Sequence, residues 1–299
     1  MIFFINFLLF NIHQRSDFII HYVLCIVQNA KCDINPCGIC DMFGVAERVK
    51  ENTMKKFKLW DKALIIFILI LWQIVGMMGI VPEFMLPTPV EVLTALINDW
   101  QLIAQSSLVT LWEAMLGMGL ALMVSVATAV AMDRFKVIHE ALFPICVVSQ
   151  TVPTIAIAPL LVLWFGFGMT PKVLLVFITC FFPLLVGLVS GFDSADKNVL
   201  RLYKSMGAGY VRVLFDVKFP YATESFFAGL KVSASYSIVG AVIAEWLGGE
   251  GGLGVYMTRV RKSFQFDKMF AVIIVVSALS LILMKLVEKL QKRALKWKN

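Results

Sequence analysis

The sequence predicts an all-α integral membrane protein, and three observations carry that prediction. The 299 residues are 60% apolar and only 16% charged. Their mean hydropathy is +0.83, well above that of soluble globular domains. Long runs without a charged side chain recur through residues 63–284, and most approach the roughly 20 residues that cross a bilayer as a helix. We therefore expect one membrane domain with six transmembrane helices.

The six expected spans follow from these uncharged runs and cover residues 63–82, 115–132, 141–171, 173–192, 223–244 and 269–284. The third run is interrupted by prolines, so a single straight helix is not expected there. Pro153 and Pro159 each remove a backbone hydrogen bond and release the carbonyls of Ser149 and Ile155, which a bilayer tolerates only against protein or a wet cavity.

Charge placement predicts the orientation of the spans. Segments expected inside after Met54 hold 17 Lys and Arg residues, and those expected outside hold 5, as the positive-inside rule requires. Both chain ends are then cytoplasmic, and residues 83–106 form an external loop. Four of the five outer cations lie in the last outer loop, and they contact either a partner protein or only solvent: Arg259, Arg261, Lys262 and Lys268.

Residues 1–53 differ in character from the rest. Their two apolar runs are too short to span a bilayer, and Met54 opens a basic start, MKKFKLWDK, directly before an apolar span. We expect Met54 to be the initiator, residues 1–53 to be a doubtful N-terminal extension and residues 54–299 to form the membrane domain. The alternative is a signal or anchor segment, although the order of its regions is wrong for a cleavable signal.

The cysteines do not indicate a metal site or a disulfide framework. Cys32, Cys37 and Cys40 have the spacing of a plant-type iron–sulfur site, but the fourth ligand is missing, which favours chance spacing. Cys146 and Cys180 fall inside predicted membrane helices. We expect no metal to be bound by this chain.

A polar, basic island at residues 193–222 separates the fourth span from the fifth and is expected in the cytosol. Its apolar residues recur at the three- and four-residue intervals of an amphipathic helix: Val199, Leu202, Tyr203, Met206 and Tyr210. Gly207 and Gly209 then interrupt the helix, a second apolar run follows, and Pro220 opens the next span. The expected order is helix, turn, helix and membrane span.

This island resembles the cytosolic signature of permease subunits of binding-protein-dependent ABC importers, which reads E-A-A-x-x-x-G, nine residues, then I-x-L-P. Gly207 takes the glycine position and Val217 to Pro220 the last four, whereas Arg201, Leu202 and Tyr203 replace Glu, Ala and Ala. The resemblance implies a coupling helix that sits in a cleft of the ATPase subunit. The residues it assigns to coupling are Val199, Leu202, Tyr203, Met206, Gly207, Ala208, Val217 and Pro220.

Two further stretches narrow the resemblance. The segment VSQTVPTIAIAPLLVLWFGFG is similar to the nitrate, sulfonate and taurine branch, and IVGAVIAEWLGGEGGLGVYMTRVRKSFQFDKMFA looks most like permeases for thiamine pyrimidine precursors such as hydroxymethylpyrimidine. The resemblance implies a bacterial plasma-membrane permease, present as a homodimer, with two ATPase subunits inside and a substrate-binding protein outside. It also implies that this chain is not an enzyme and binds no cofactor, since its partner uses the ATP.

The chain shows no nucleotide-binding motif of its own. The P-loop pattern G-x-x-x-x-G-K-[S/T] does not occur, so an ATP-driven motor would be another polypeptide. Gly249, Gly251 and Gly254 spell G-x-G-x-x-G, but they follow a membrane helix rather than a strand, and we interpret them as a flexible external turn. The net charge of +7 lies beside apolar runs, which argues against nucleic-acid binding.

Polar residues within the spans are candidates for a translocation pathway. Gln150, Thr151 and Thr154 flank the proline break, where lipid-facing polar groups would be costly. Ser233, Tyr236, Ser237 and Gly240 share one face of the fifth span, and close packing through small residues is the alternative for that face. Among ionisable residues, Glu113 lies near span two, and Lys231 in span five either has a function or snorkels to the surface.

Two other classes of protein stay open as alternatives. An ion-coupled secondary carrier would commonly show two related repeats and a buried ion-binding carboxylate. A membrane-embedded enzyme would need clustered His, carboxylate or Ser/Lys groups, and His13, His21 and His139 are scattered. A neighbouring reading frame with a P-loop and another for a secreted binding protein would favour the importer.

Overall fold

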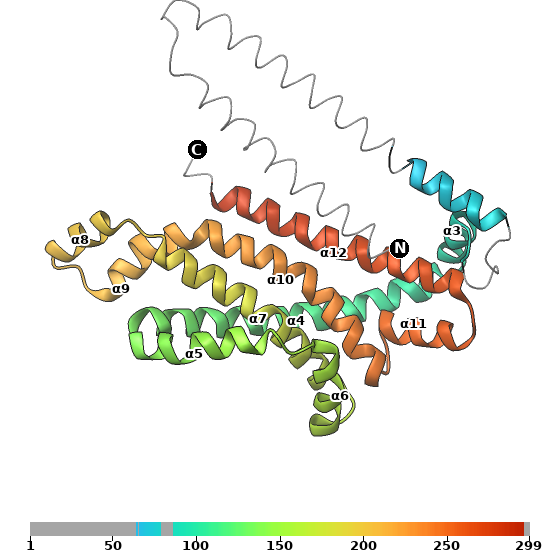
Figure 1. Cartoon of the computed structure of the whole chain (residues 1–299), viewed down its shortest axis with the longest axis horizontal. Coiled ribbons are helices and arrows are strands. Elements are labelled where there is room, and N and C mark those ends of the chain that lie inside the picture. The colour runs from blue at the N-terminus through green and yellow to red at the C-terminus, as the bar shows by residue number, and fades with distance from the viewer. Residues whose placement is uncertain (1–63, 65, 79–85, 296–299) are drawn as a thin grey trace, which may run out of the picture. The chain divides into compact units, whose positions relative to one another are not determined.

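The computed structural model describes residue 64, residues 66–78 and residues 86–295, and these are helical with no strand among them. The chain divides into two compact units, Met1–Ile68 and Leu69–Asn299, and the second holds all the labelled helices (Figure 1). In chain order they are α3 (Pro89–Asn98), α4 (Trp100–Arg134), α5 (Lys136–Ser149), α6 (Thr154–Phe165), α7 (Met169–Asp193), α8 (Lys197–Ser205), α9 (Tyr210–Val213), the π-helical turn η1 (Leu214–Lys218), α10 (Phe219–Gly248), α11 (Leu253–Lys262) and α12 (Phe266–Ala294).

Four helical stretches in the described residues are long and apolar enough to cross a membrane: α4, α7, Tyr210–Gly248 and α12. The all-α membrane fold predicted from composition is therefore confirmed. Helices α5 and α6 count as a fifth span only if taken as one element. The predicted first span lies partly outside the described residues, which include a shorter apolar helix, Ile66–Met77. Six spans stay a prediction, and the predictions for residues 1–53 also fall outside the described part.

The predicted third span is broken, as its prolines indicated. Helices α5 and α6 meet at an angle of 100° across residues 150–153, and Pro153 caps the start of α6 with an extended backbone. Proline cannot donate the hydrogen bond that would continue α5, and it disfavours a helical conformation in the residue before it. The break therefore has a direct covalent cause.

The segment predicted as an external loop, residues 83–106, is helical over most of its described length. Helix α3 begins there with a capping box, in which the Glu91 amide donates to Thr88 Oγ1 at 3.3 Å and the Thr88 amide donates to Glu91 Oε2 at 2.8 Å. Pro89 occupies the first turn, where its missing N–H costs nothing. Helix α4 then starts at Trp100, well before residues 115–132, on which the predicted second span is centred.

The core of the second unit lies where α4, α7, α10 and α12 pack together. Ala114, Val176, Leu184 and Ile238 are fully buried in it. Helices α7 and α10 approach closely at Gly187 and Gly229. The approach is so close that a methyl group on either glycine would clash with the backbone of the other helix. Small residues that allow such approach are the usual basis of helix packing in membranes, where no hydrophobic force acts between helices.

Candidate functional site

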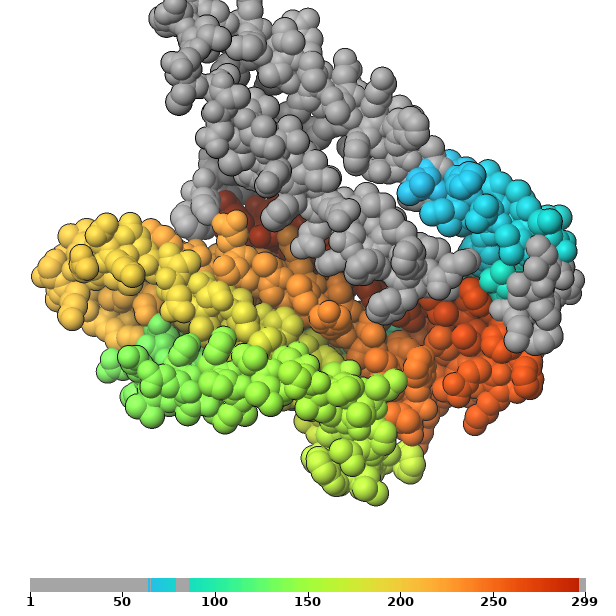
Figure 2. Space-filling model, in the orientation of Figure 1, coloured from blue at the N-terminus to red at the C-terminus, as the bar shows by residue number. Residues whose placement is uncertain are grey.

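The polar island of the sequence forms a projecting loop, residues 194–218, which we call the α8 loop. It contains α8, α9 and η1 and lies at the opposite end of α10 from α11 (Figure 1; yellow in Figure 2). Four of its apolar side chains are mostly exposed: Leu202 (57%), Met206 (74%), Val211 (64%) and Phe215 (63%). A cluster of exposed apolar groups on an otherwise polar segment is typical of a surface that a partner covers.

Gly207 ends α8 in a Schellman motif. Its φ is +74°, the Ala208 amide donates to the Tyr203 carbonyl at 3.0 Å, and the Gly207 amide donates to the Lys204 carbonyl at 3.1 Å. This left-handed conformation favours glycine strongly over residues with a Cβ. A Cβ added to Gly207 would meet no atom within 4 Å, so the glycine is required by backbone conformation and not by crowding.

The base of the α8 loop is tied to the end of α4 through Asp133. The Tyr210 hydroxyl donates to Asp133 Oδ2 at 3.0 Å, and Lys218 Nζ lies 2.5 Å from Asp133 Oδ1. The Arg134 guanidinium sits over the Tyr210 ring at 4.9 Å. These contacts from both sides of η1 would transmit movement of the loop to α4. Asp133 could not be identified from the sequence, because only the fold brings it to the loop.

Val217, one of the residues assigned to coupling, lies inside rather than on the surface, and Pro220 is half-buried. Val217 is 2% exposed and belongs to η1, where the Phe219 amide donates to the Leu214 carbonyl five residues back. Pro220 follows at the start of α10 and cannot supply the normal α-helical bond, which accounts for the wider turn. Any part of Val217 in coupling would therefore be to position the loop.

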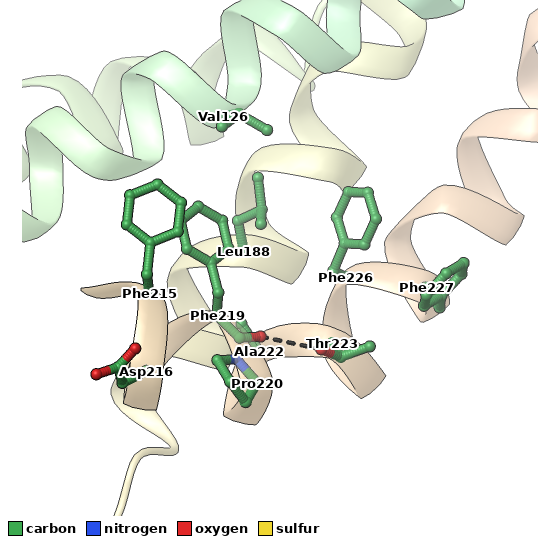
Figure 3. Close-up of a pocket in the computed structure, with 10 residues that line it drawn as sticks. All are labelled: Val126, Leu188, Phe215, Asp216, Phe219, Pro220, Ala222, Thr223, Phe226 and Phe227. Carbon is green, nitrogen blue, oxygen red and sulfur yellow. Dashed lines mark hydrogen bonds between the residues drawn. The ribbon is translucent and has the colours of Figure 1, made fainter. Parts of the chain in front are cut away.

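An apolar cavity of about 630 Å³ lies beside the α8 loop. Figure 3 shows side chains from α4, α7, η1 and α10 around it, with Phe215 and Phe219 turned toward Val126. The loop is therefore loosely packed on this side. The lining residues are Val126, Leu188, Phe215, Asp216, Phe219, Pro220, Ala222, Thr223, Phe226 and Phe227.

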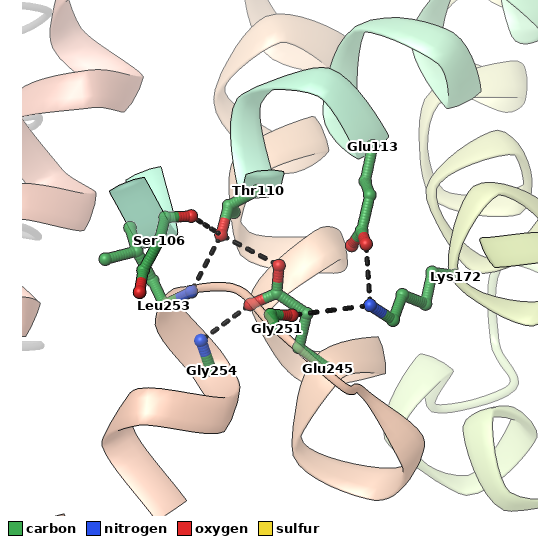
Figure 4. A network of polar contacts seen from close by, with 8 residues as sticks. All are labelled: Ser106, Thr110, Glu113, Lys172, Glu245, Gly251, Leu253 and Gly254. Carbon is green, nitrogen blue, oxygen red and sulfur yellow. Dashed lines mark hydrogen bonds and ion pairs between the residues drawn. The ribbon is translucent and has the colours of Figure 1, made fainter. Parts of the chain in front are cut away.

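A buried polar cluster lies toward the other end of the spans, and the sequence did not predict it (Figure 4). Lys172 Nζ of α7 lies 2.6 Å from Glu113 Oε1 of α4 and 3.5 Å from the Gly251 carbonyl in the α10–α11 turn. Lys172 is the fifth of the predicted outer cations, the one outside the last outer loop, and it is only 5% exposed. The cluster joins three spans to the turn.

Glu245 of α10 organises the turn that follows it. Its Oε1 accepts from the Thr110 hydroxyl at 2.8 Å and its Oε2 accepts from the Gly254 amide at 2.6 Å, while the Leu253 amide donates to Thr110 Oγ1 at 2.9 Å. A Cβ on Gly252 or Gly254 would collide with Glu245. The glycine-rich stretch, which we interpreted as a flexible turn, is thus a tight cradle around a carboxylate, and α11 begins directly after it.

The predicted pathway residues fall into two groups. Gln150 and Thr151 are exposed at the α5–α6 break, and Tyr236 is 54% exposed. Ser233 is buried against α7, where its hydroxyl donates to the Cys180 carbonyl at 3.0 Å, and Ser237 is also buried. Burial of the two serines matches the packing alternative for that face. The role of all six residues, Gln150, Thr151, Thr154, Ser233, Tyr236 and Ser237, in a pathway stays a prediction.

Lys268 alone of the four cations in the last predicted outer loop is neutralised in the described structure. Its Nζ lies 2.7 Å from Asp99 Oδ2, which also accepts from the Tyr256 hydroxyl at 2.7 Å. These two hydrogen bonds, Lys268 first, hold the pKa of Asp99 below its usual value. The last turn of α11 holds Arg259, Arg261 and Lys262, where positive charges interact favourably with the negative end of the helix dipole.

Comparison with known proteins decides the family. The family model for the inner membrane component of binding-protein-dependent transport systems matches residues 121–296. The chain belongs to this family. This match confirms the family resemblance that the sequence of the permease showed at Gly207, Val217 and Pro220 and in the two longer stretches before and after them.

Curated relatives agree with this assignment. The permease is 34% identical to a probable ABC transporter permease protein of Haemophilus influenzae, over 76% of this chain and 94% of the relative. It is 29% identical to the formylaminopyrimidine transport permease ThiX of Halalkalibacterium halodurans, over 78% and 94%, and 29% identical to the putative aliphatic sulfonates permease SsuC of Bacillus subtilis, over 85% and 94%. The predicted branch is thus confirmed.

Solved structures agree on the fold. The crystal structure of an amino acid ABC transporter superposes with a TM-score of 0.56 at 15% identity, covering 67% of this chain and 97% of that one. The family match and the curated relatives make the permease a multi-pass membrane component of an ABC transporter for small solutes, and the solved structure shows that it has the same membrane fold.

Proposed function

We propose that this permease is the translocating subunit of an ATP-driven importer and receives its solute from an external binding protein. The single observation that carries the proposal is the α8 loop, because its exposed apolar residues and fixed glycine turn project from the end of two spans. A surface of this kind requires a partner. In the proposed orientation in the membrane, both chain ends and the α8 loop are cytoplasmic and α11 is external. Two ATPase subunits bind on the cytoplasmic side and use the ATP.

The active unit contains two copies of this chain. Two ATPases must be engaged, and closed two-fold symmetry is the usual arrangement of such assemblies. Exposed apolar side chains along α5 and α6, among them Ile145, Leu163 and Trp164, leave ample surface for a second copy as well as for lipid. This chain has no catalytic role of its own in the proposal.

A thiamine pyrimidine precursor is the favoured solute, with sulfonates, taurine and nitrate close behind. This preference rests on the stretch that includes Glu245 and the glycine-rich turn, and the formylaminopyrimidine permease is one of the relatives. In such importers the binding protein does most of the selecting. Calorimetric titration of the binding protein that works with this permease should show hydroxymethylpyrimidine binding tightly and taurine weakly, and tight binding of a sulfonate alone would reassign the solute.

The cationic end of α11 is proposed as part of the docking surface for the binding protein. Arg259, Arg261 and Lys262 are exposed and have no carboxylate partner among the described residues. Reversing all three to Glu should raise the concentration of binding protein needed to stimulate ATP hydrolysis roughly tenfold, since complementary charge governs encounter.

The control for this triple charge reversal is Lys289→Glu, an exposed cation near the opposite end of the spans. Its ATP hydrolysis should respond to the binding protein as wild type does. Added salt should narrow the gap between the triple variant and wild type. An unchanged response of the triple variant at low salt would assign this cluster to solvent alone.

A further inference from the structure

Three charged side chains are buried in the described part of the chain, and all three meet in one cluster. Glu113, Lys172 and Glu245 are 2%, 5% and 1% exposed. Two carboxylates and one ammonium leave one net negative charge if all are ionised. A buried charge without a counter-ion costs several kcal/mol, so the cluster requires one further positive charge.

The surroundings of the cluster supply no such charge. Helix α6 contains no ionisable residue, Glu250 in the turn is exposed, and α11 offers the cluster only the amides of Leu253 and Gly254. The cations of α11 lie in its last turn. The only groups that titrate within the cluster are therefore its own three members.

One polar atom in the cluster lacks a hydrogen-bond partner. Glu113 Oε2 is the sole buried side-chain oxygen or nitrogen without one in the described structure. In Figure 4 the carboxyl group that carries it lies on the side of Glu245, and each of the two carboxyl groups is in the electrostatic field of the other. The missing donor therefore belongs between two carboxyl groups, where neither oxygen can donate unless one group carries a proton.

We propose that this cluster is a proton-binding site in which Glu113 and Glu245 share one proton at neutral pH. A proton from water adds to one carboxylate, supplies the missing donor to Glu113 Oε2 and brings the net charge to zero. Two carboxyl groups in one site cannot readily both ionise. A metal cation fits less well, because the Lys172 ammonium already occupies the position 2.6 Å from Glu113 Oε1.

The proposal makes stability dependent on pH, whatever solute is carried. Above about pH 4.3 an unfolded chain has released the glutamate proton, while the folded protein keeps it. Folding therefore becomes less favourable as pH rises until the folded protein also releases the proton, by up to about tenfold in the equilibrium constant per pH unit. Glu113→Gln removes one carboxyl group, so the charge of Lys172 is balanced by that of Glu245 alone. This variant should therefore lose the dependence of folding stability on pH.

Infrared spectroscopy and thermal unfolding of the purified full-length protein in lipid nanodiscs test the site. Wild type at neutral pH should show the carbonyl stretch of a buried carboxylic acid, and Glu113→Gln and Glu245→Gln should each lose it. Glu250→Gln, a change at an exposed carboxyl group in the adjacent turn, should retain it. Between about pH 6 and about pH 9 the melting temperature of wild type should fall relative to both cluster variants.

Two results would overturn the proposal. One is a carboxylic-acid band that neither cluster variant alters, together with melting curves that stay parallel across the pH range. The other is a wild-type melting temperature that responds to sodium or potassium concentration and not to pH, which would assign the site to a metal ion. Either cluster variant suffices for the comparison if the other fails to fold.

Discussion

Replacing Gly207 with Val should uncouple ATP hydrolysis from transport while leaving membrane insertion intact. The φ of +74° is strained for a β-branched residue by about 1–3 kcal/mol. The Schellman turn would then rearrange and move Leu202 and Met206 away from their docking positions. Because each 1.4 kcal/mol is a factor of ten, uptake should fall by roughly 5- to 150-fold. The measurement is binding-protein-stimulated ATP hydrolysis and uptake at matched protein levels.

The same turn offers a matched control in Gly209. It is exposed, and a Cβ there also meets no atom within 4 Å, but its φ of −68° and ψ of 163° are extended backbone that valine adopts readily. Gly209→Val should therefore retain most of the coupling, and Val199→Leu on α8 should retain nearly all. If Gly207→Val transports like wild type, the coupling site does not lie in the α8 loop.

Replacing Lys172 with Met should give the largest loss of stability among single changes in the described structure. It removes the only cation from a cluster with two buried carboxyl groups. Breaking a buried ion pair by deleting one partner costs about 3–5 kcal/mol, because the remaining charge stays uncompensated. Thermal unfolding in lipid nanodiscs should show a clearly lower melting temperature and a lower yield of folded protein.

The control for this variant is Lys136→Met, which breaks the exposed pair between Lys136 and Glu140 on α5. Solvent screens such pairs, so no measurable change is expected. Adding both Glu113→Gln and Glu245→Gln to Lys172→Met should recover part of the lost stability, since no member of the buried cluster is then charged. Equal melting temperatures for Lys172→Met and Lys136→Met would mean that the buried pair contributes nothing to the fold.

The sequence was sufficient for features that depend on local chemistry. Uncharged runs placed both ends of α7 and α10 and the start of α12 within a few residues, and Pro153 located the break between α5 and α6. Helix α3 was missed, although Thr88, Pro89 and Glu91 form a capping box that the sequence displays. Turn residues there were interpreted as a loop when they were in fact the start of a helix.

The buried cluster could not be predicted in the same way. Glu113 and Lys172 are 59 residues apart, and Thr110 and Glu245 are 135 apart, so only the packing of α4, α7 and α10 brings them together. An ionisable residue inside a span was the one available signal, and it drew attention to Glu113. Positive-inside counting assigned Lys172 to the outer side but could not show its burial or its pairing, because a charge count carries no information about partners.

The most direct test of the proposed function is uptake of labelled hydroxymethylpyrimidine into liposomes that contain the permease and its ATPase. Uptake should require both ATP on the α8-loop side and binding protein on the α11 side, and it should persist when ionophores collapse every ion gradient. The same preparation with Gly207→Val should hydrolyse ATP without a response to binding protein. Uptake that proceeds without ATP and stops when an ion gradient is collapsed would contradict the importer and establish a secondary carrier instead.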